Sequence, residues 1–506
     1  MGKIVALHEL SEILNAIRQN ENKKIIHCHG VFDLLHIGHI RYFEQARQMG
    51  DVLVVTLTSD QFVDKGPQRP AFPEILRAEA IASLEVVDYV AINSWPTAEE
   101  TIRLLRPDIY VKGSEYKKRT SDFTGKIERE EKVVKEIGAT LAFTEDIVFS
   151  STNLINRYFS HFSDEIQQYL QLFRNRYKHE DIFKIIDSTS NLNVLVIGDS
   201  IIDDYQYCTT IGKSSKDPML ALKYESNDIF VGGVIAVANH VSSFVKHVQL
   251  VTVLGEYDSY ESFIKTQLHS NVTIYYETQD KAPTIVKKRF IDVDSLNKLF
   301  EVYTMDDSGL SNKKNKKICQ LLKNEISKYD LVIVADFGHG MVSKDMITVL
   351  RKHSKYLAVN TQANAGNRGF HSISKYPLSD YVCIAEHELR LEMRDLKTDI
   401  RTLMNRLMNK IECTMLVVTS GRNGCAVLYK NDEFVKIPAF TGNIVDRIGA
   451  GDAFNSFTAL LAAMNVNFEI IGFLGNVVGA LAVEILGNKK SIDKQSVKNF
   501  VVSLLK

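Results

Sequence analysis

Between residue 24 and about residue 160, short apolar runs alternate with segments whose apolar residues recur at helical spacing. Strands that are apolar on both faces and separated by helices are typical of a parallel sheet covered on both sides. The predicted strands are 24–28, 52–57, 87–92, 109–111 and 140–143, and the predicted helices are 37–49, 73–83, 98–105 and 128–137. The pattern therefore predicts an α/β fold with a doubly wound, Rossmann-like sheet.

A second series of strands begins at Val194-Leu195-Val196-Ile197, after a polar, charged and aromatic stretch without strand signals. The length of 506 residues suits roughly two to four domains. We expect a first α/β domain over 1–160, a helical linker over 161–190, and a second doubly wound α/β domain over 191–506.

The composition excludes several classes of protein. A formal net charge of -1 gives no overall attraction to nucleic acid or anionic lipid. No apolar run approaches the roughly 18 residues that span a bilayer, and residues 1–20 are typical of an amphipathic helix with acidic residues, not of a signal peptide. The six cysteines are scattered and form no C-x-x-C pair, as reduced core thiols do. We expect a cytoplasmic protein that binds neither nucleic acid nor membrane.

A first candidate site follows the strand 24–28. His36 and His39 form an H-x-G-H tetrad that begins a helix, directly after the turn Gly30-Val31-Phe32-Asp33. Backbone N–H groups are unpaired at a helix N-terminus, and the helix dipole is positive there. Two imidazoles one turn apart can therefore contact one triphosphate while negative charge develops on departing pyrophosphate.

Three further elements are candidates for the same site. Lys112 follows the strand 109–111, at the carboxyl end where ligands bind in open parallel sheets. Ser151 and Thr152 begin the last predicted helix of the domain and offer hydroxyl and N–H groups to phosphate. Arg69 and Arg77 carry guanidinium groups that could bind phosphates.

A second candidate site lies near the C-terminus, where Gly449-Ala450-Gly451-Asp452 precedes an apolar helix. Small residues let the backbone N–H groups approach a phosphate and surround charge that develops during its transfer. The carboxylate of Asp452 can take a proton from an incoming hydroxyl. Other segments strengthen this interpretation: Gly198 to Asp203, Gly232-Gly233, and Thr419 to Gly424.

The first set of motifs resembles the cytidylyltransferase-like superfamily of nucleotidylyltransferases over residues 24 to 158, and the segments 111–116 and 151–153 are most similar to its heptose 1-phosphate adenylyltransferase branch. The resemblance implies that His36 and His39 stabilise the leaving triphosphate and that Lys112 contacts phosphates. It implies a nucleotide-binding turn made by Gly30, Phe32 and Asp33, and nucleotide contacts from Arg77, Ser151 and Thr152. The chain departs from the pattern of that branch in two places. It has Thr58-Ser59-Asp60 where the branch has Asn-Ser-Asp, and it has a small insertion at 117–125.

The second set resembles the ribokinase-like carbohydrate kinases over residues 193 to about 500, and the segments 198–205 and 335–340 are most similar to heptose 7-phosphate kinase. The resemblance implies that residues 211–225 are the lid and substrate-binding hairpin. By the same resemblance, Asp452 is the catalytic base, and the anion hole is formed by Gly449, Ala450 and Gly451. The sugar is bound by Asp203, Gly232 and Gly233. ATP is bound by Thr419, Gly421 and Asn476, and Glu388 acts indirectly on the metal.

Two segments depart from the kinase pattern. The N-x-x-E element reads Ala385-Glu386-His387-Glu388, and the D-P-K element reads Asn360-Thr361-Gln362. These changes affect the metal water network and a lysine contact. They leave open a nucleotidylyltransferase whose kinase-like domain is a binding or regulatory module.

Together the two domains resemble the bifunctional heptose-phosphate kinase and adenylyltransferase with its domains in reverse order. We expect an enzyme that phosphorylates a sugar or sugar phosphate and joins a sugar 1-phosphate, heptose-like, to a nucleotide. The reactions would use Mg²⁺, ATP in the kinase, and ATP or CTP in the transferase. A CTP-using enzyme that acts on an alditol phosphate is the other alternative. We expect small-molecule substrates and a homo-oligomer.

Overall fold

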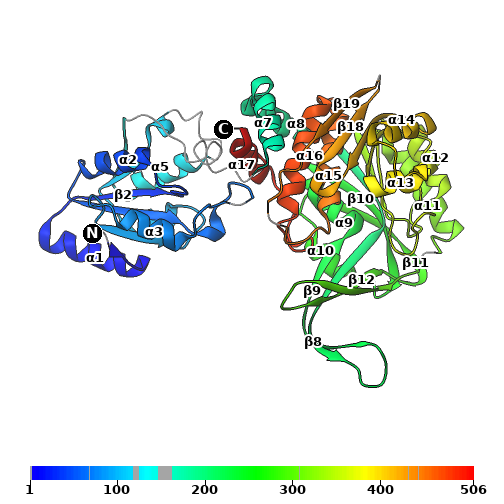
Figure 1. Ribbon diagram of the computed structural model, residues 1–506, viewed down its shortest axis with the longest axis horizontal. Helices are drawn as coiled ribbons and strands as arrows, with labels where there is room; N and C mark the ends of the chain where they lie inside the picture. The colour runs from blue at the N-terminus through cyan, green and yellow to red at the C-terminus, as the bar shows by residue number, and fades with distance from the viewer. Residues whose placement is uncertain are drawn as a thin grey trace. The chain divides into compact units, whose positions relative to one another are not determined.

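The computed structural model describes residues 3–67, 69–117, 125–145, 162–306, 308–430, 432–442 and 444–505. The chain divides into two compact units, one comprising Met1–His161 with Asn499–Lys506 and the other Phe162–Lys498. Both units are α/β folds (Figure 1).

The first unit contains a six-stranded, fully parallel sheet in the order β1-β4-β3-β2-β5-β6. Its strands are β1 (Lys3–Ile4), β2 (Ile25–Gly30), β3 (Val52–Thr58), β4 (Tyr89–Asn93), β5 (Ile109–Lys112) and β6 (Thr140–Phe143). Its helices are α1 (Leu7–Glu21), α2 (Ile37–Arg47), α3 (Glu74–Ala82), α4 (Glu99–Leu105) and α5 (Lys126–Glu136). The strand order reverses between β2 and β5, where open parallel sheets bind ligands.

Strand β3 shows how the sequence produces this doubly wound arrangement. All seven of its residues are buried. Leu53 and Val55 pack with residues of α2 and α3, whereas Val52 and Val54 pack with residues of α1. Because successive side chains point to opposite faces, a continuously apolar strand needs helices on both sides. The strands and helices predicted between residues 24 and 143 agree with the observed ones to within two residues at each end. The helix predicted over 1–20 begins only at Leu7, after the short strand β1 that the sequence did not predict, and the helix predicted to begin at Ser151 lies outside the described residues.

Residues 162–190 form two helices, as expected, but the structure places them in the second unit. They are α7 (Asp164–Arg176) and α8 (His179–Ser188). Phe173 is fully buried and stacks on Phe473 with a centroid distance of 4.1 Å. Arg176 donates two hydrogen bonds of 2.7 Å to the carboxylate of Glu469. The segment is therefore packed structure and not an exposed connection.

The second unit is built on a nine-stranded sheet in the order β11-β10-β7-β14-β15-β16-β17-β18-β19, in which only β18 runs antiparallel to its neighbours. Its strands are β7 (Asn193–Gly198), β10 (His247–Tyr257), β11 (Val272–Pro283), β14 (Leu331–Asp336), β15 (Leu357–Thr361), β16 (Leu378–Ala385), β17 (Glu412–Thr419), β18 (Cys425–Tyr429) and β19 (Glu433–Ile437). The other helices are α9 (Gly233–Ser242), α10 (Glu261–Gln267), α11 (Asn312–Glu325), α12 (Lys344–His353), α13 (Glu386–Met393), α14 (Ile400–Lys410), α15 (Ala450–Ala463) and α16 (Phe468–Ala482). The last helix, α17 (Lys494–Leu505), belongs to the second unit up to Lys498 and to the first unit from Asn499.

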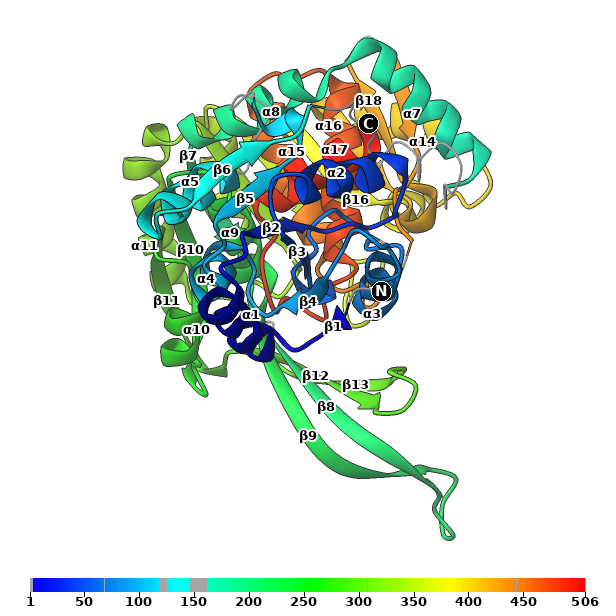
Figure 2. The same cartoon turned by 90° about the vertical axis from the view of Figure 1, so that its left-hand side faces the viewer.

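A smaller four-stranded sheet, the lid, projects from this unit (Figures 1 and 2). It consists of β8 (Ser200–Lys213), β9 (Leu220–Gly232), β12 (Ile285–Asp292) and β13 (Lys298–Thr304). The lid is larger than the predicted 211–225. Asp199 alone separates β8 from β7, and Ser200 pairs with Gly233 where the chain returns to the main sheet.

Candidate active sites

The first candidate site lies at the carboxyl ends of β2 and β5, where the sheet order reverses. His36 is the N-cap of α2, and its Nδ1 accepts a hydrogen bond of 3.1 Å from the N–H of Gly38. The rings of His36 and His39 stack with a centroid distance of 3.9 Å. Within the described residues, Nε2 of His36 and Nδ1 of His39 are buried without a hydrogen-bond partner. These two nitrogens are available to a ligand.

Burial sets the protonation of the histidine pair. Desolvation lowers the pKa of His36, and desolvation together with the neighbouring His36 lowers the pKa of His39 to about 3. At neutral pH the unliganded pair is therefore uncharged. A neutral imidazole carries one N–H. In His36, whose Nδ1 accepts from Gly38, that N–H is at Nε2 and can donate to a polyanion. His39 also contacts the carbonyl oxygen of Leu34 and donates through Nδ1 in the tautomer that carries the proton there, while the N-terminus of α2 supplies positive potential.

The turn before the helix has a constrained backbone. Phe32 has a φ of 48°, and a Cβ on Gly30 would lie 3.0 Å from the Phe32 ring. The buried carboxylate of Asp33 accepts hydrogen bonds from Arg69, at 2.6 Å, and from the N–H of Ala71, at 2.5 Å. Asp33 thus holds the loop after β3, a contact that its predicted place in a nucleotide-binding turn did not include.

Arg77 is buried, and its guanidinium is engaged by the protein. It donates to the carbonyl oxygens of Val31, Phe72 and Thr58 and to the carboxylate of Asp60. These acceptors come from three separate loops. The contacts indicate that Arg77 fixes the walls of the site, and nucleotide contact by Arg77 stays a prediction.

Lys112 ends β5 and is buried. Its Nζ lies 2.9 Å from Oε2 of Glu130, and it also approaches the rings of Tyr110 and Tyr116. Glu130, which the sequence did not single out, therefore orients Lys112. The predicted phosphate-binding residues Ser151 and Thr152 lie outside the described residues.

The second candidate site lies at the N-terminus of α15. Gly449 is the N-cap with a φ of 83°, and a Cβ there would lie 2.2 Å from Oδ1 of Asn488. A Cβ on Gly451 would meet no atom within 4 Å, so space is open beside Gly451. The first N–H groups of a helix have no intrahelical acceptor. This geometry suits a phosphate.

Asp452 is buried in the first turn of α15. Burial is the main cause that raises its pKa to about 7, and the carboxylates of Asp203 and Glu388 act in the same direction. A hydrogen bond from Gln362 and the charge of Lys287 oppose the rise. A carboxylate with a pKa near neutral pH is suited to accept a proton and release it again.

Asp203, in β8, faces the same region and pairs with Arg289 of β12. A Cβ on Gly232 would lie 2.3 Å from Oδ2 of Asp203, so only glycine leaves room for this carboxylate. Gly233 has a φ of 56° and begins α9. The three residues predicted to bind the sugar are therefore together at the base of the lid.

Lys287 and Gln362 belong to this site, but the sequence did not assign them to it. Lys287 is only 7% exposed, and its pKa is lowered by burial although the charge of Asp203 opposes the shift. The sequence did contain a signal for Lys287. Lys287 and Arg289 alternate along a strand and so lie on the same face, and basic residues that face a core are rare and indicate a functional site. Gln362 was recognised only as a departure from a lysine.

The residues predicted to bind ATP lie at the end of β17, in the turn that follows it and within α16. Thr419 ends β17, and a Cβ on Gly421, which has a φ of 56°, would meet no atom within 4 Å. The side-chain amide of Asn476 donates to the carbonyl oxygens of Ile437 and Pro438. Asn476 thus holds the segment after β19, and nucleotide contact by these three residues stays a prediction.

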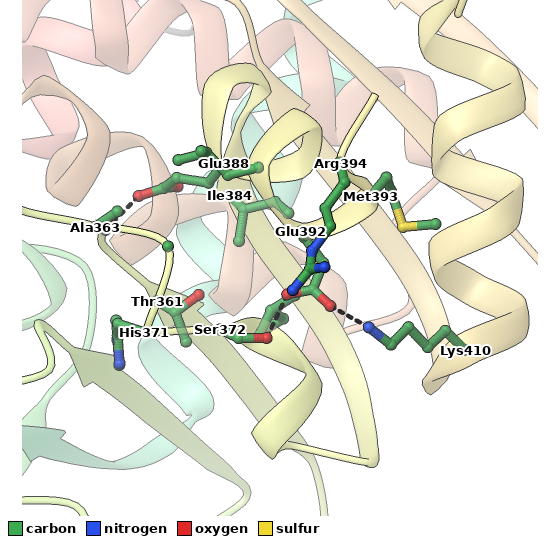
Figure 3. A pocket seen from close by; sticks show the side chains of 13 residues that line it. Thr361, Ala363, His371, Ser372, Ile384, Glu388, Glu392, Met393, Arg394 and Lys410 are labelled. Carbon is green, nitrogen blue, oxygen red and sulfur yellow. Dashed lines mark hydrogen bonds and ion pairs between the residues drawn. The ribbon is translucent and has the colours of Figure 1, made fainter. Parts of the chain in front are cut away.

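A cavity of about 450 Å³ borders this site and is lined by Thr361, Ala363 and Glu388, among others (Figure 3). The carboxylate of Glu388 accepts hydrogen bonds of 2.7 Å from the N–H groups of Ala363 and Ala385. Burial raises the pKa of Glu388 to about 7 in spite of these bonds. Glu388 therefore fixes the loop that follows β15.

No group of three or more His, Cys, Asp or Glu side chains with metal-binding geometry occurs in the ranges that the structure describes. A magnesium ion at this site would be held chiefly by the nucleotide phosphates, with Glu388 acting on it only indirectly, through the loop that Glu388 holds. No helix among the described residues is long and apolar enough to cross a bilayer.

Two protein families match the chain. The family described as pfkB family carbohydrate kinase matches residues 191–495, and the family described as Cytidylyltransferase-like matches residues 27–157. The order of the two matches is the one expected from the motifs.

Two relatives share the name "Bifunctional protein HldE". The one from Nitratiruptor sp. is 44% identical over 108 residues, 21% of this chain and 23% of the relative. The one from Aliarcobacter butzleri is 41% identical over 149 residues, 29% of each chain. The chain thus matches about a quarter of the length of these relatives.

Among solved structures, the tetrameric inhibited form of phosphofructokinase-2 from Escherichia coli covers 62% of this chain and 99% of its own, with a TM-score of 0.51 and 15% identity. This similarity supports the ribokinase-like fold of the second unit.

Proposed function

The chain belongs to the pfkB family of carbohydrate kinases, and on that premise we propose that residues 191–506 transfer a phosphoryl group from ATP to a hydroxyl of a sugar or sugar phosphate. The observation that carries the proposal is Asp452, a buried carboxylate with a pKa near 7 that directly follows the open N-terminus of α15. A base and an anion site are thereby adjacent, as phosphoryl transfer requires.

In the proposed reaction, each group of residues in the second unit has a separate role. Asp452 takes the proton of the attacking hydroxyl, and the N–H groups of Gly449, Ala450 and Gly451 stabilise the charge on the transferred phosphoryl group. Asp203 accepts hydrogen bonds from sugar hydroxyls at the base of the lid. Mg²⁺ bound to the phosphates supplies charge neutralisation.

For the first unit we propose a nucleotidyl transfer in which the phosphate of a sugar 1-phosphate attacks the α-phosphorus of a nucleoside triphosphate and pyrophosphate leaves. Support comes from the match of residues 27–157 and from the unpartnered ring nitrogens of His36 and His39. Together the reactions would yield a nucleotide-activated sugar. The resemblance of the segments 111–116, 151–153, 198–205 and 335–340 to heptose-phosphate enzymes favours a heptose and ATP, and the Cytidylyltransferase-like match keeps CTP as an alternative.

We further propose that the protein is a homo-oligomer that associates through the lid. Large apolar side chains are exposed there, including Ile211, Met219, Tyr224, Phe300 and Val302. Exposed apolar patches on a sheet mark association surfaces, and the phosphofructokinase-2 neighbour is described as tetrameric.

The test uses the full chain with a panel of sugars, sugar 1-phosphates and other sugar phosphates, each with Mg²⁺ and either ATP or CTP. Products are identified by mass spectrometry, and pyrophosphate is measured separately. We expect a phosphorylated sugar and a nucleotidyl sugar. Formation of neither product across the panel contradicts the proposal, and formation of only one assigns activity to one unit.

A further inference from the structure

Gln362, the first residue after β15, contacts the carboxylate of Asp452. Its Nε2 donates a hydrogen bond to Oδ1 of Asp452 and lies 3.2 Å from Oδ1 of Asn360. In the part of the chain that the structure describes, no hydrogen bond to Oδ2 of Asp452 is present. The two oxygens of the carboxylate are therefore inequivalent before any substrate binds.

The orientation of the Gln362 amide follows from its neighbour. Asn360 uses its side-chain N–H to donate a 2.8 Å hydrogen bond to the carbonyl oxygen of Cys383. Its Oδ1 is consequently an acceptor that faces Gln362. Gln362 must then direct its NH₂ group, and not its Oε1, toward both Asn360 and Asp452.

The backbone on either side of the Gln362 side chain is fixed as well. The N–H of Gln362 donates to the carbonyl oxygen of Asp336 at 3.0 Å. The next N–H, of Ala363, is held by Glu388 (Figure 3). Because both peptide groups are anchored, the amide reaches Asp452 in a defined position.

The charged groups that face Asp452 come from other elements. Asp203 on β8 and Glu388 on α13 disfavour its ionised form, and Lys287 on β12 favours it. Gln362 also favours the ionised form, because an N–H donor stabilises a carboxylate and not a protonated acid at the same oxygen. Gln362 thus counteracts burial at the site of the base.

We infer that Gln362 is a positioning residue that holds Oδ1 of Asp452 and leaves Oδ2 to take the proton of the attacking hydroxyl. Only the second part of this inference, that Oδ2 takes a proton from a hydroxyl, rests on the proposed kinase function. Asn360 and Gln362 are the two residues by which this chain departs from D-P-K. Their neutral side-chain amides are hydrogen-bonded to each other, and Gln362 is bonded to the base where the kinase pattern has a lysine.

The test compares Gln362→Leu and Gln362→Lys in the full chain, with Gln320→Leu on the exposed face of α11 as a matched control. The titration of Asp452 is followed by infrared difference spectra of each protein against the same protein with Asp452→Asn. We expect the midpoint to rise by about one pH unit in Gln362→Leu, because a charge-assisted hydrogen bond is lost. Gln362→Lys should lower it, because an ammonium group replaces a neutral donor.

Kinetics supply the second readout. If the kinase is active, the low-pH limb of the kcat profile should move to higher pH in Gln362→Leu and to lower pH in Gln362→Lys. The KM for ATP of both variants should stay within a few-fold of the parental value. Equal midpoints in the parent and both variants, or shifts of the same sign in both variants, overturn the inference. Opposite shifts with no turnover of the parent on any sugar leave the positioning of Asp452 intact and remove the proposed kinase function.

Discussion

Lys298, on the lid strand β13, forms an ion pair with Asp446, which lies in the loop that leads to the phosphate-binding turn of α15. Asp446 is buried and also accepts hydrogen bonds from the hydroxyl of Tyr205 and the N–H groups of Ile448 and Gly487. Burial alone would raise its pKa, but Lys298 and Tyr205 hold the pKa below the usual range. Two side chains of the lid, Lys298 on β13 and Tyr205 on β8, thus bind the loop before the anion site through Asp446.

Replacing Lys298 by Met should lower the free energy of unfolding by about 1 kcal/mol at pH 7. A carboxylate whose pKa is depressed in the folded state contributes stability above its unfolded pKa of about 4 and loses it as the pH falls through the folded value. The deficit of Lys298→Met should therefore be complete above about pH 5 and shrink toward pH 3. Urea unfolding across this range is the measurement. Lys288→Met, whose ammonium is exposed and 3.5 Å from Asp204, should show little deficit.

His39→Ala and His36→Asn should each reduce pyrophosphate release by about 10²- to 10³-fold, because each removes one donor aimed at the leaving group. Asparagine at position 36 retains an acceptor for the N-cap, so the helix start is preserved. Sugar-dependent ATP consumption should be unchanged. The control is His8→Ala on the exposed face of α1. Parental rates of pyrophosphate release at saturating nucleotide would exclude these roles.

Asp452→Asn should reduce sugar phosphorylation by about 10²- to 10⁴-fold while ATP affinity, measured by calorimetry, is retained. Since the carboxylate must be ionised to accept a proton and its pKa is about 7, the parental kcat should rise with pH through neutrality and level off above about pH 8. Asp164→Asn, an exposed carboxylate in the first turn of α7, serves as control. Equal turnover in the parent and in Asp452→Asn would contradict the assignment of Asp452 as the base. A parent that binds ATP but turns over no sugar would favour a binding module.

Arg77→Lys should destabilise the first unit by about 2 kcal/mol, because lysine cannot reproduce hydrogen bonds to acceptors in three loops. The fluorescence of Trp95, the one tryptophan of the sequence, reports unfolding of this unit. The exposed pair of Arg103 with Glu100 provides the control Arg103→Lys. A tenfold rise in nucleotide KM with unchanged stability would instead support the direct phosphate contact expected from the sequence.

Phe173→Ala should cost about 3–5 kcal/mol of stability in the second unit, because a fully buried ring stacked on Phe473 is removed. The adjacent Leu172 is 60% exposed, so Leu172→Ala should change stability by less than about 0.5 kcal/mol. Thermal unfolding followed by circular dichroism distinguishes the two. Similar values for both variants would mean that α7 contributes little to the packed unit.

Local signals predicted most elements of the first unit because its strands are short, mainly apolar runs and most of its helices have an apolar stripe. They failed for the lid, since β9 has polar, exposed residues at successive positions and only its last three residues are buried. The packing of α7 could not be predicted either. Phe173 meets a partner 300 residues away, and nothing in the polar residues around it identifies that partner.

The candidate sites show the same division. Gly449 and Asp452 were recognisable because the backbone geometry and the base belong to one short motif. The roles of Asp33 and Arg77 were not, because their partners are a distant arginine and backbone carbonyl oxygens that no sequence pattern marks. Gln362 was noticed as a substitution, and only the folded chain brings it to a residue 90 positions later.

The single residue between β7 and β8 makes the lid a lever. The chain enters the lid through Asp199, whose carboxylate is bonded to the N–H groups of Phe337 and Met341, leaves it at Gly233, which pairs with Ser200, and enters it again after Thr284, between β11 and β12. These crossings lie side by side, because Ile201 pairs with both Gly232 and Ile285, so the sheet can rotate about the line through them. At about 3.3 Å per residue, the 14 residues of β8 reach about 46 Å from that axis, whereas Asp203 lies only about 10 Å away. A rotation of about 5° would then carry the tip through about 4 Å and the sugar-binding carboxylate through less than about 1 Å. Large excursions of the lid tip are thereby compatible with a nearly stationary binding site.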